Sequence, residues 1–326
     1  MKITKLLIHG LVLMLPLTFL WTAMAEADTE KPIIVSTTSA VGTIVQEFLG
    51  DAADVVVLVQ PGLCPADFDM KPSDIYAVSN AKVLFHQNIP GEFWLQGLLD
   101  AAGNADLTQV AIPGAYNTPE GAKNYIRWVG GNLSQILNID LESKISEMQN
   151  DFDEVSSWIT GKADALEAST VKVICMNWLK TFVESVGFTV VATYNPPETL
   201  SAGDINNLIN TAQTESVALI VDNLQIDVDF GKGIASQVGA EHVVLTNFPG
   251  AIPGTGNLSQ MFRYNAEQLF NGTATWRSTA TLRAEREDLK NQVAFLQIAA
   301  SLAVIAACAE AVWLYIGRRK RELPRK

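Results

Sequence analysis

Histidine and cysteine are scarce in this sequence, with three of each among 326 residues. Cys64 and Cys175 lie far apart in the central part of the chain and Cys308 lies in an apolar run near its end, so a disulfide-rich scaffold is excluded. Whether Cys64 and Cys175 pair with each other is left open by the sequence. There is also no G-x-S-x-G elbow, P-loop or H-E-x-x-H motif, and we therefore expect no enzyme.

Basic residues are fewer than acidic ones, 23 against 35, and the basic residues gather at the two termini. The formal net charge of −12 is therefore still more negative for the region between the termini. Nucleic acid is excluded as a partner on this ground, because nucleic-acid-binding domains present basic patches.

Long hydrophobic runs occur near both ends of the chain. The first, residues 6–20, follows Lys2 and Lys5 and precedes the small-residue pattern Ala23-Met24-Ala25. This order predicts a secretory signal peptide over residues 1–27, with an uncleaved signal anchor as the alternative.

The second hydrophobic run, residues 293–316, is long enough to cross a bilayer as one helix. A basic cluster at residues 318–321 follows it, and the positive-inside rule places such a cluster in the cytoplasm. We therefore expect a single-pass protein of the cell membrane. Its ectodomain faces outward and residues 317–326 form a short cytoplasmic tail.

The ectodomain shows the alternation of strands and helices that is typical of α/β proteins. Short β-branched runs at residues 33–36 and 55–59 flank a segment, 41–50, with apolar residues at helical spacing. A mostly helical stretch over 120–167 follows, with the apolar stripe of a long amphipathic helix at positions 145, 148, 152, 155 and 159. The α/β rhythm then resumes at about residue 171, and Gly187 is expected to end a helix over 179–186. The predicted fold class is therefore α/β, with two lobes of parallel-rich sheets joined by one long helix, plus the signal peptide and the transmembrane helix.

These patterns also predict where functional side chains lie and where the parts of the chain begin and end. Ligands in open α/β sheets bind beyond the carboxyl ends of the strands, so functional side chains are expected in the loops there. The predicted parts are a signal peptide (1–27), an N-terminal α/β lobe (28–118), a linking long helix (119–170), a C-terminal α/β lobe (171–272), a helical stalk (273–292), a transmembrane helix (293–316) and the tail (317–326).

The stalk carries apolar residues at near-heptad spacing. Leu282, Leu289, Val293 and Leu296 follow one another at intervals of seven, four and three positions. This spacing predicts a helix that lifts the lobes off the membrane, with a weak dimerising coiled coil as the alternative.

A family resemblance appears in the segment 57–74, which contains Pro61-Gly62 and ends in Pro72-Ser73-Asp74. The segment resembles the L-V-P-P-G-x-D-P-H-x-Y-E-P-T-P-S-D stretch of the zinc and manganese solute-binding proteins of ABC importers. Further pieces that resemble this family follow in the same order at residues 88–95, 187–188, 201–208, 217–222 and 263–265. The resemblance implies an extracytoplasmic component that passes a metal ion to an ABC permease in the same membrane.

The positions that the resemblance assigns to metal ligands hold other residues here. Ala66 occupies the first histidine position, and the second falls in the shortened stretch Asn117-Thr118-Pro119. Met176 occupies the third, and Thr246 or Asn247 stands where the family has a late aspartate. The usual histidine ligands are therefore replaced.

Three interpretations of this replacement remain open. Sulfur ligands from Cys64, Cys175 and Met176 would suit copper or another soft ion. Oxygen ligands from Asp67, Asp69, Asp222 and Asn247, with Asn177 as a further candidate, would suit manganese, calcium or magnesium.

The third interpretation is that the same scaffold binds a small polar organic solute or acts as a docking module without a ligand. For the metal interpretations the transported ion is a divalent or soft one, namely zinc, manganese or copper. The candidate ligands are Cys64, Asp67, Cys175, Met176, Asp222 and Asn247.

Overall fold

The computed structural model describes residues 31–322, so the expected signal peptide lies outside the described residues. The chain divides into two compact α/β units. The first contains Met1–Val59 and Pro65–Ile112, and the second contains Gln60–Cys64 and Pro113–Lys326.

The first unit is built on a four-stranded parallel sheet with the order β2-β1-β3-β4. Its strands are β1 (Ile33–Ser36), β2 (Asp54–Val57), β3 (Ala81–His86) and β4 (Thr108–Ala111). Its helices are α2 (Ser39–Leu49), α3 (Pro72–Ser79) and α4 (Leu95–Ala102), with short 3-10 turns at Gly50–Ala52, Pro65–Asp67 and Pro90–Glu92. The parallel pairing confirms the predicted α/β fold class for this unit.

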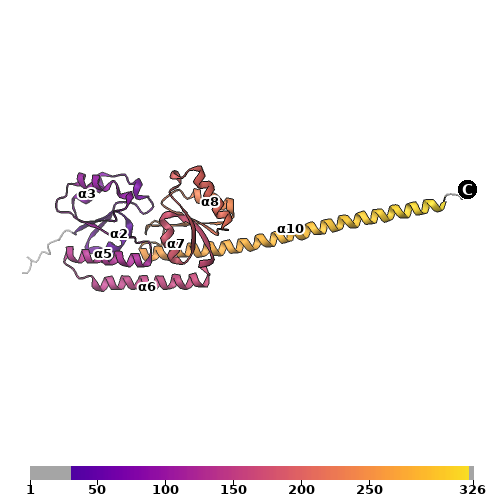
Figure 1. The fold of residues 1–326 in the computed structure, drawn as a ribbon. Coiled ribbons are helices and arrows are strands. Elements are labelled where there is room, and N and C mark those ends of the chain that lie inside the picture. The colour runs from indigo at the N-terminus through magenta and orange to yellow at the C-terminus, as the bar shows by residue number, and fades with distance from the viewer. Residues whose placement is uncertain (1–30, 323–326) are drawn as a thin grey trace, which may run out of the picture. The chain divides into compact units, whose positions relative to one another are not determined.

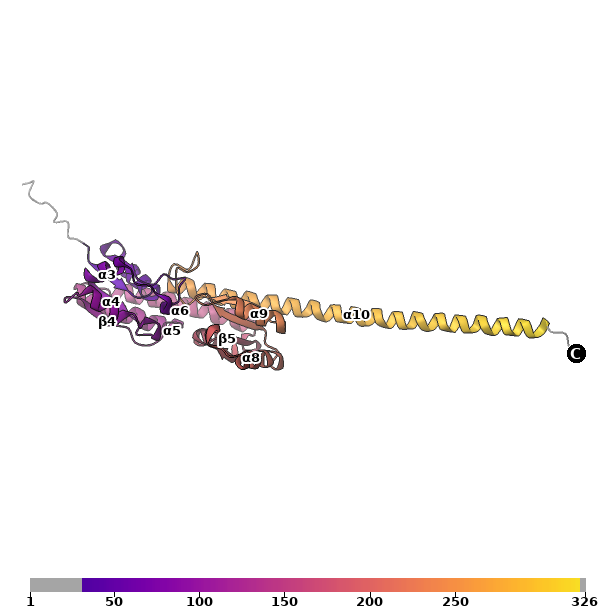
Figure 2. The same ribbon diagram turned by 90° about the horizontal axis from the view of Figure 1, so that it is seen from above.

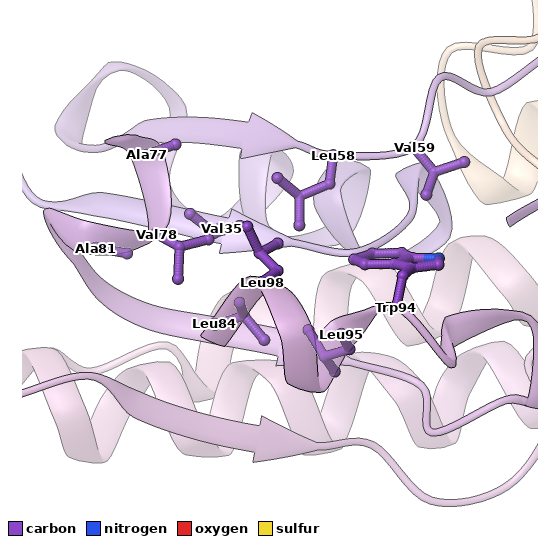
Figure 3. Close-up of a cluster of buried hydrophobic side chains, with 10 residues drawn as sticks. All are labelled: Val35, Leu58, Val59, Ala77, Val78, Ala81, Leu84, Trp94, Leu95 and Leu98. Carbon is purple, nitrogen blue, oxygen red and sulfur yellow. The ribbon is translucent and has the colours of Figure 1, made fainter. Parts of the chain in front are cut away.

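A cluster of apolar side chains between this sheet and the helices α3 and α4 forms a core of the first unit (Figure 3). Val35 and Leu84 come from neighbouring strands, and Leu98 of α4 is fully buried against them. Trp94 closes one end of the cluster, where its ring packs against Phe68 with the ring centroids 4.2 Å apart. Burial of this apolar surface is the main stabilising contribution to the unit.

The second unit repeats the design with a parallel sheet of order β6-β5-β7-β8. Its strands are β5 (Lys172–Met176), β6 (Thr189–Tyr194), β7 (Leu219–Asn223) and β8 (Glu241–Leu245). Its shorter helices are α7 (Lys180–Val186), α8 (Ala202–Thr214) and α9 (Asp229–Val238). Gly187 ends α7 with a φ of 106°, a left-handed conformation that glycine adopts without strain, as the sequence predicted.

The linking segment is helical and consists of α5 (Pro119–Leu137) and α6 (Glu142–Ala165), which pack side by side (Figure 1). Asn138 takes a left-handed φ of 54° and ends α5. The predicted apolar stripe of α6 is buried, and Phe152 on this stripe meets Phe262 edge to face, with the ring centroids 5.7 Å apart. These contacts join α6 to the start of the last helix.

The last helix, α10 (Leu258–Glu322), runs without interruption from the core of the second unit to the end of the described chain (Figure 2). Its first turns pack against β7, β8 and α6. From Thr281 onward, every side chain described is exposed. The segment Asp288–Ile316, 29 residues long, contains an 18-residue stretch with a mean hydropathy of 2.0, so it is long and apolar enough to cross a membrane, which agrees with the predicted span.

Candidate functional site

The first unit gathers buried polar side chains at the carboxyl ends of β1 and β3. Glu92, which is 6% exposed, accepts hydrogen bonds from the Thr37 hydroxyl and from the backbone N–H groups of Gln87 and Ile89, the latter two at 3.2 Å. The Thr38 hydroxyl donates to Gln87 Oε1 at 2.6 Å. A buried carboxylate needs such donors, because desolvation otherwise makes its charge very costly. Glu92 therefore holds the two strand ends together.

His86 lies at the edge of the same cluster, at the end of β3. Its Nδ1 atom is buried, has no hydrogen-bond partner among the described residues, and lies 4.0 Å from Glu92 Oε2. This is the one histidine of the described part of the first unit.

Asp67 and Ala66 lie in the 3-10 turn Pro65–Asp67 and are exposed. A hydrogen bond holds this turn in place: the indole Nε1–H of Trp94 donates to the Pro65 carbonyl oxygen at 2.8 Å. Ala66, at the first histidine position of the resemblance, therefore stands on a rigidly held turn but offers no ligand atom.

Asp222 lies in β7 of the second unit, is 2% exposed and is held on two sides. The Tyr194 hydroxyl donates to its Oδ1 atom, and His242 Nε2 lies 2.7 Å from its Oδ2 atom. Burial raises the pKa of Tyr194, and the neighbouring Asp222 charge raises this pKa further, so the phenol stays a donor. The candidate ligand Asp222 is thus part of a buried hydrogen-bonded cluster with Tyr194 and His242.

Cys175 and Met176 are the last two residues of β5 and are 0% and 1% exposed. Consecutive residues of a strand point to opposite faces of the sheet, so these two side chains lie on different faces. Burial raises the pKa of the Cys175 thiol to about 12, which keeps it in the neutral thiol form at neutral pH. Cys64 is 7% exposed and is not joined to Cys175 by a disulfide.

A second polar network fixes the loop after β8. The Gln225 amide donates to the Pro61 carbonyl and to the Thr246 hydroxyl, both at 2.9 Å, and accepts from the Asn247 backbone N–H at 3.2 Å. Asn265 of α10 pairs with the backbone of Thr246, accepting from its N–H at 3.0 Å and donating to its carbonyl at 2.8 Å. Thr246, one of the two residues that the resemblance aligns with the late aspartate, is therefore hydrogen-bonded and is fully buried.

Asn247 is half-buried, and its backbone carbonyl accepts a hydrogen bond from the Tyr116 hydroxyl at 2.7 Å. Sequence reasoning missed Gln225 and Asn265, whose partners lie far away along the chain. Within residues 31–322, the structure contains no group of three or more histidine, cysteine, aspartate or glutamate side chains arranged to hold a metal ion. The six candidate ligands therefore stay a prediction from the sequence.

Two parallel α/β units with polar side chains at their strand ends, a helical pair after the first and an apolar helix after the second define an α/β solute-binding protein scaffold. The sequence profile of the family of periplasmic zinc-uptake complex component A (ZnuA) matches residues 34–272, which is most of the chain. The chain belongs to this family. Its members are periplasmic metal-binding transport proteins and not enzymes, as the sequence led us to expect.

Individual relatives agree with this membership. The manganese-binding lipoprotein MntA of Halalkalibacterium halodurans is 22% identical over 273 residues, which cover 75% of this chain and 89% of the relative. The periplasmic zinc-binding protein TroA of Treponema pallidum has a similar structure, with a TM-score of 0.65 at 16% identity over 74% of this chain and 99% of that one. A crystal structure of ZnuA is also similar, with a TM-score of 0.62 at 18% identity over 74% of this chain and 99% of that one.

Proposed function

We propose that this protein is the extracytoplasmic solute-binding component of a metal-ion ABC importer, with a ligand set that differs from the histidine set of its family. The observation that carries this proposal is the family match over residues 34–272, which spans both α/β units. The transported ion is a divalent or soft metal, and the named relatives favour zinc or manganese among the candidates.

The proposed topology follows from the apolar part of α10. Residues 293–316, within the apolar segment Asp288–Ile316, cross the cell membrane, both α/β units face outward, and the basic residues after the span stay in the cytoplasm. A receptor anchored beside its permease meets it at a raised effective concentration, which supports delivery in the same membrane.

Among the six candidate ligands, Asp67 and Asn247 are the ones whose residues are not buried. Asp222 is already bonded to Tyr194 and His242, and Cys175 is a buried neutral thiol. We therefore put Asp67 and Asn247 forward as the two candidate ligands whose residues are accessible, and oxygen ligands of this kind favour manganese over copper.

The test is a metal titration of the purified metal-free chain in detergent, under reducing conditions, with the melting temperature as readout. A metal that binds only the folded state at 100 times its Kd stabilises by about 2.7 kcal/mol, which raises the Tm by roughly 5–10 °C for a protein of this size. We expect this shift with Mn²⁺ and its loss in Asp67→Ala and Asn247→Ala. Gln213→Ala, an exposed change on α8, is the matched control.

A second candidate function, a docking module without a metal, is favoured by the network around Thr246. Thr246 is one of the two residues that the resemblance aligns with the family's late aspartate, and here Gln225 and Asn265 hydrogen-bond to it without an ion. Absence of a Tm shift with Mn²⁺, Zn²⁺ and Cu⁺ would contradict the metal proposal and leave this candidate.

A further inference from the structure

The exposed part of α10 carries a continuous apolar seam that no other described part of the chain covers. Leu282, Leu289, Val293 and Leu296 are 62%, 60%, 52% and 64% exposed. They fall on the a and d positions of one heptad frame, with Leu282 and Leu289 at d and Val293 at a. Leu282 and Leu289 precede the proposed span over residues 293–316, and leucines that repeat on a helix outside the membrane indicate a partner helix. Val293 and Leu296 continue the same face into the proposed span.

The same face is hollowed. A groove of about 330 Å³ runs along it and is lined by Arg286, Leu289, Lys290, Val293, Ala294 and Gln297. Arg286 is the one charged residue at an a position between Leu282 and Leu296, and a single polar residue at such a position selects register and stoichiometry in coiled coils.

The heptad frame continues into the apolar part of the helix without a break. Its a and d positions there hold the small residues Ala300, Ala303 and Ala307. Small side chains let two helices approach closely in lipid, where apolar side chains alone give no driving force for association. Glu310, the only acidic residue between 289 and 316, falls on the next d position of the same face. Facing a partner helix spares this carboxyl group the contact with lipid.

From these observations we infer that α10 pairs with α10 of a second copy of this chain, in a parallel two-stranded coiled coil that runs from Leu282 into the membrane. Two copies that cross one membrane with the same topology must run parallel. In a parallel pair, a g residue faces the e residue five positions later on the partner. In this helix the g residue is Glu285 and the e residue is Lys290, which carry opposite charges. By two-fold symmetry, Glu285 of each copy pairs with Lys290 of the other.

Charge complementarity favours a second copy over a permease helix as the occupant. The Glu285 and Lys290 positions complement each other within one sequence, and the apolar seam matches itself in the parallel register. This inference rests on the proposed membrane topology but not on the proposed metal transport, because it does not involve the α/β units or a metal ion.

The first experiment uses the full chain in native membranes, with Cys308→Ser as background, and compares disulfide formation by Leu289→Cys and Asn291→Cys. Both positions are exposed on α10, but residue 291 falls on the f position, opposite the seam. We expect a cross-linked dimer from Leu289→Cys and at least fivefold less from Asn291→Cys. Equal yields at both positions, or a cross-link of Leu289→Cys to a different protein, would overturn the inference.

The second experiment reverses the charges. Glu285→Lys alone and Lys290→Glu alone are each expected to weaken dimerisation in detergent roughly two- to fivefold, because exposed ion pairs contribute modestly. The double variant restores both pairs and is expected to regain the wild-type dimer fraction, measured by energy transfer between labelled copies. A double variant as weak as the single ones would contradict the parallel pairing, since a role confined to one helix predicts no such rescue.

Discussion

Two glycines of α9 provide a matched test of the buried Asp222 cluster. A Cβ atom on Gly231 would lie 2.3 Å from Asp222 Oδ2 and 2.5 Å from Oδ1, well inside the van der Waals contact of about 3.5 Å. A Cβ on Gly233, two residues later in the same helix, has nothing within 4 Å. Gly231→Ala must therefore move Asp222, whereas Gly233→Ala disturbs no neighbour.

The magnitude follows from three contributions. Overpacking costs about 1–3 kcal/mol, and weakening a hydrogen bond from Tyr194 or His242 to the charged Asp222 costs about 1.5–3 kcal/mol. Replacing glycine by alanine in a helix interior raises the free energy of unfolding by about 0.5–1 kcal/mol, which partly offsets these costs. Gly231→Ala is therefore expected to lower the free energy of unfolding by roughly 3 kcal/mol, and Gly233→Ala to raise it by roughly 0.5–1 kcal/mol.

The assay is urea unfolding of the purified chain in detergent, followed by tryptophan fluorescence. The expected outcome is opposite signs for the two variants. If Gly231→Ala were as stable as Gly233→Ala, Asp222 would be free to move, and the description of a rigid cluster with Tyr194 and His242 would be wrong.

Further predictions concern three other contacts. Gln225→Ala is expected to lower the free energy of unfolding by about 1–3 kcal/mol, because buried partners lose their bonds, while the exposed change Gln213→Ala stays within about 0.5 kcal/mol in the same urea titration. Trp94→Phe loses its bond to a backbone carbonyl and is expected to cost about 1–2 kcal/mol, against less than about 0.5 kcal/mol for the half-exposed Trp128→Phe. The pKa of Cys175 is raised in the fold to about 12 from 9.0, so its contribution to stability is complete below pH 9 and is lost as the pH rises towards 12. The free energy of unfolding should therefore fall between these values by up to about 1.4 kcal/mol per pH unit, and Cys175→Ala should show a shallower fall; equal slopes would contradict the assignment.

Local patterns predicted most of the fold. The β-branched run at 33–36 became β1 without a change of bounds, and Gly187 ends its helix as the periodicity indicated. Strand β4 was not predicted, because its four residues Thr108–Ala111 form no apolar run and only Val110 is buried. Helix α4 was missed as well. Short elements at the edge of a sheet carry little periodic signal.

The candidate site was less accessible to sequence reasoning. Cys175 and Met176 both fall at the end of β5, as expected, but strand alternation sends their side chains to opposite faces. The hydrogen-bond partners of Gln225 are Pro61, which follows β2, and Thr246 in the loop after β8. Such long-range hydrogen bonds depend on the packed fold, and no local sequence pattern predicts them.

The continuity of α10 has a consequence for reach. Gly272 packs against Val243 of the sheet, and 21 positions along the same helix lead from it to Val293, where the apolar run begins. With the proposed span over residues 293–316, a rise of 1.5 Å per residue would hold the second unit up to about 32 Å from the bilayer surface. A binding surface on a neighbouring transporter must then lie at the same distance from the membrane. A continuous helix has a fixed length, whereas a flexible linker could bring the unit closer to the membrane.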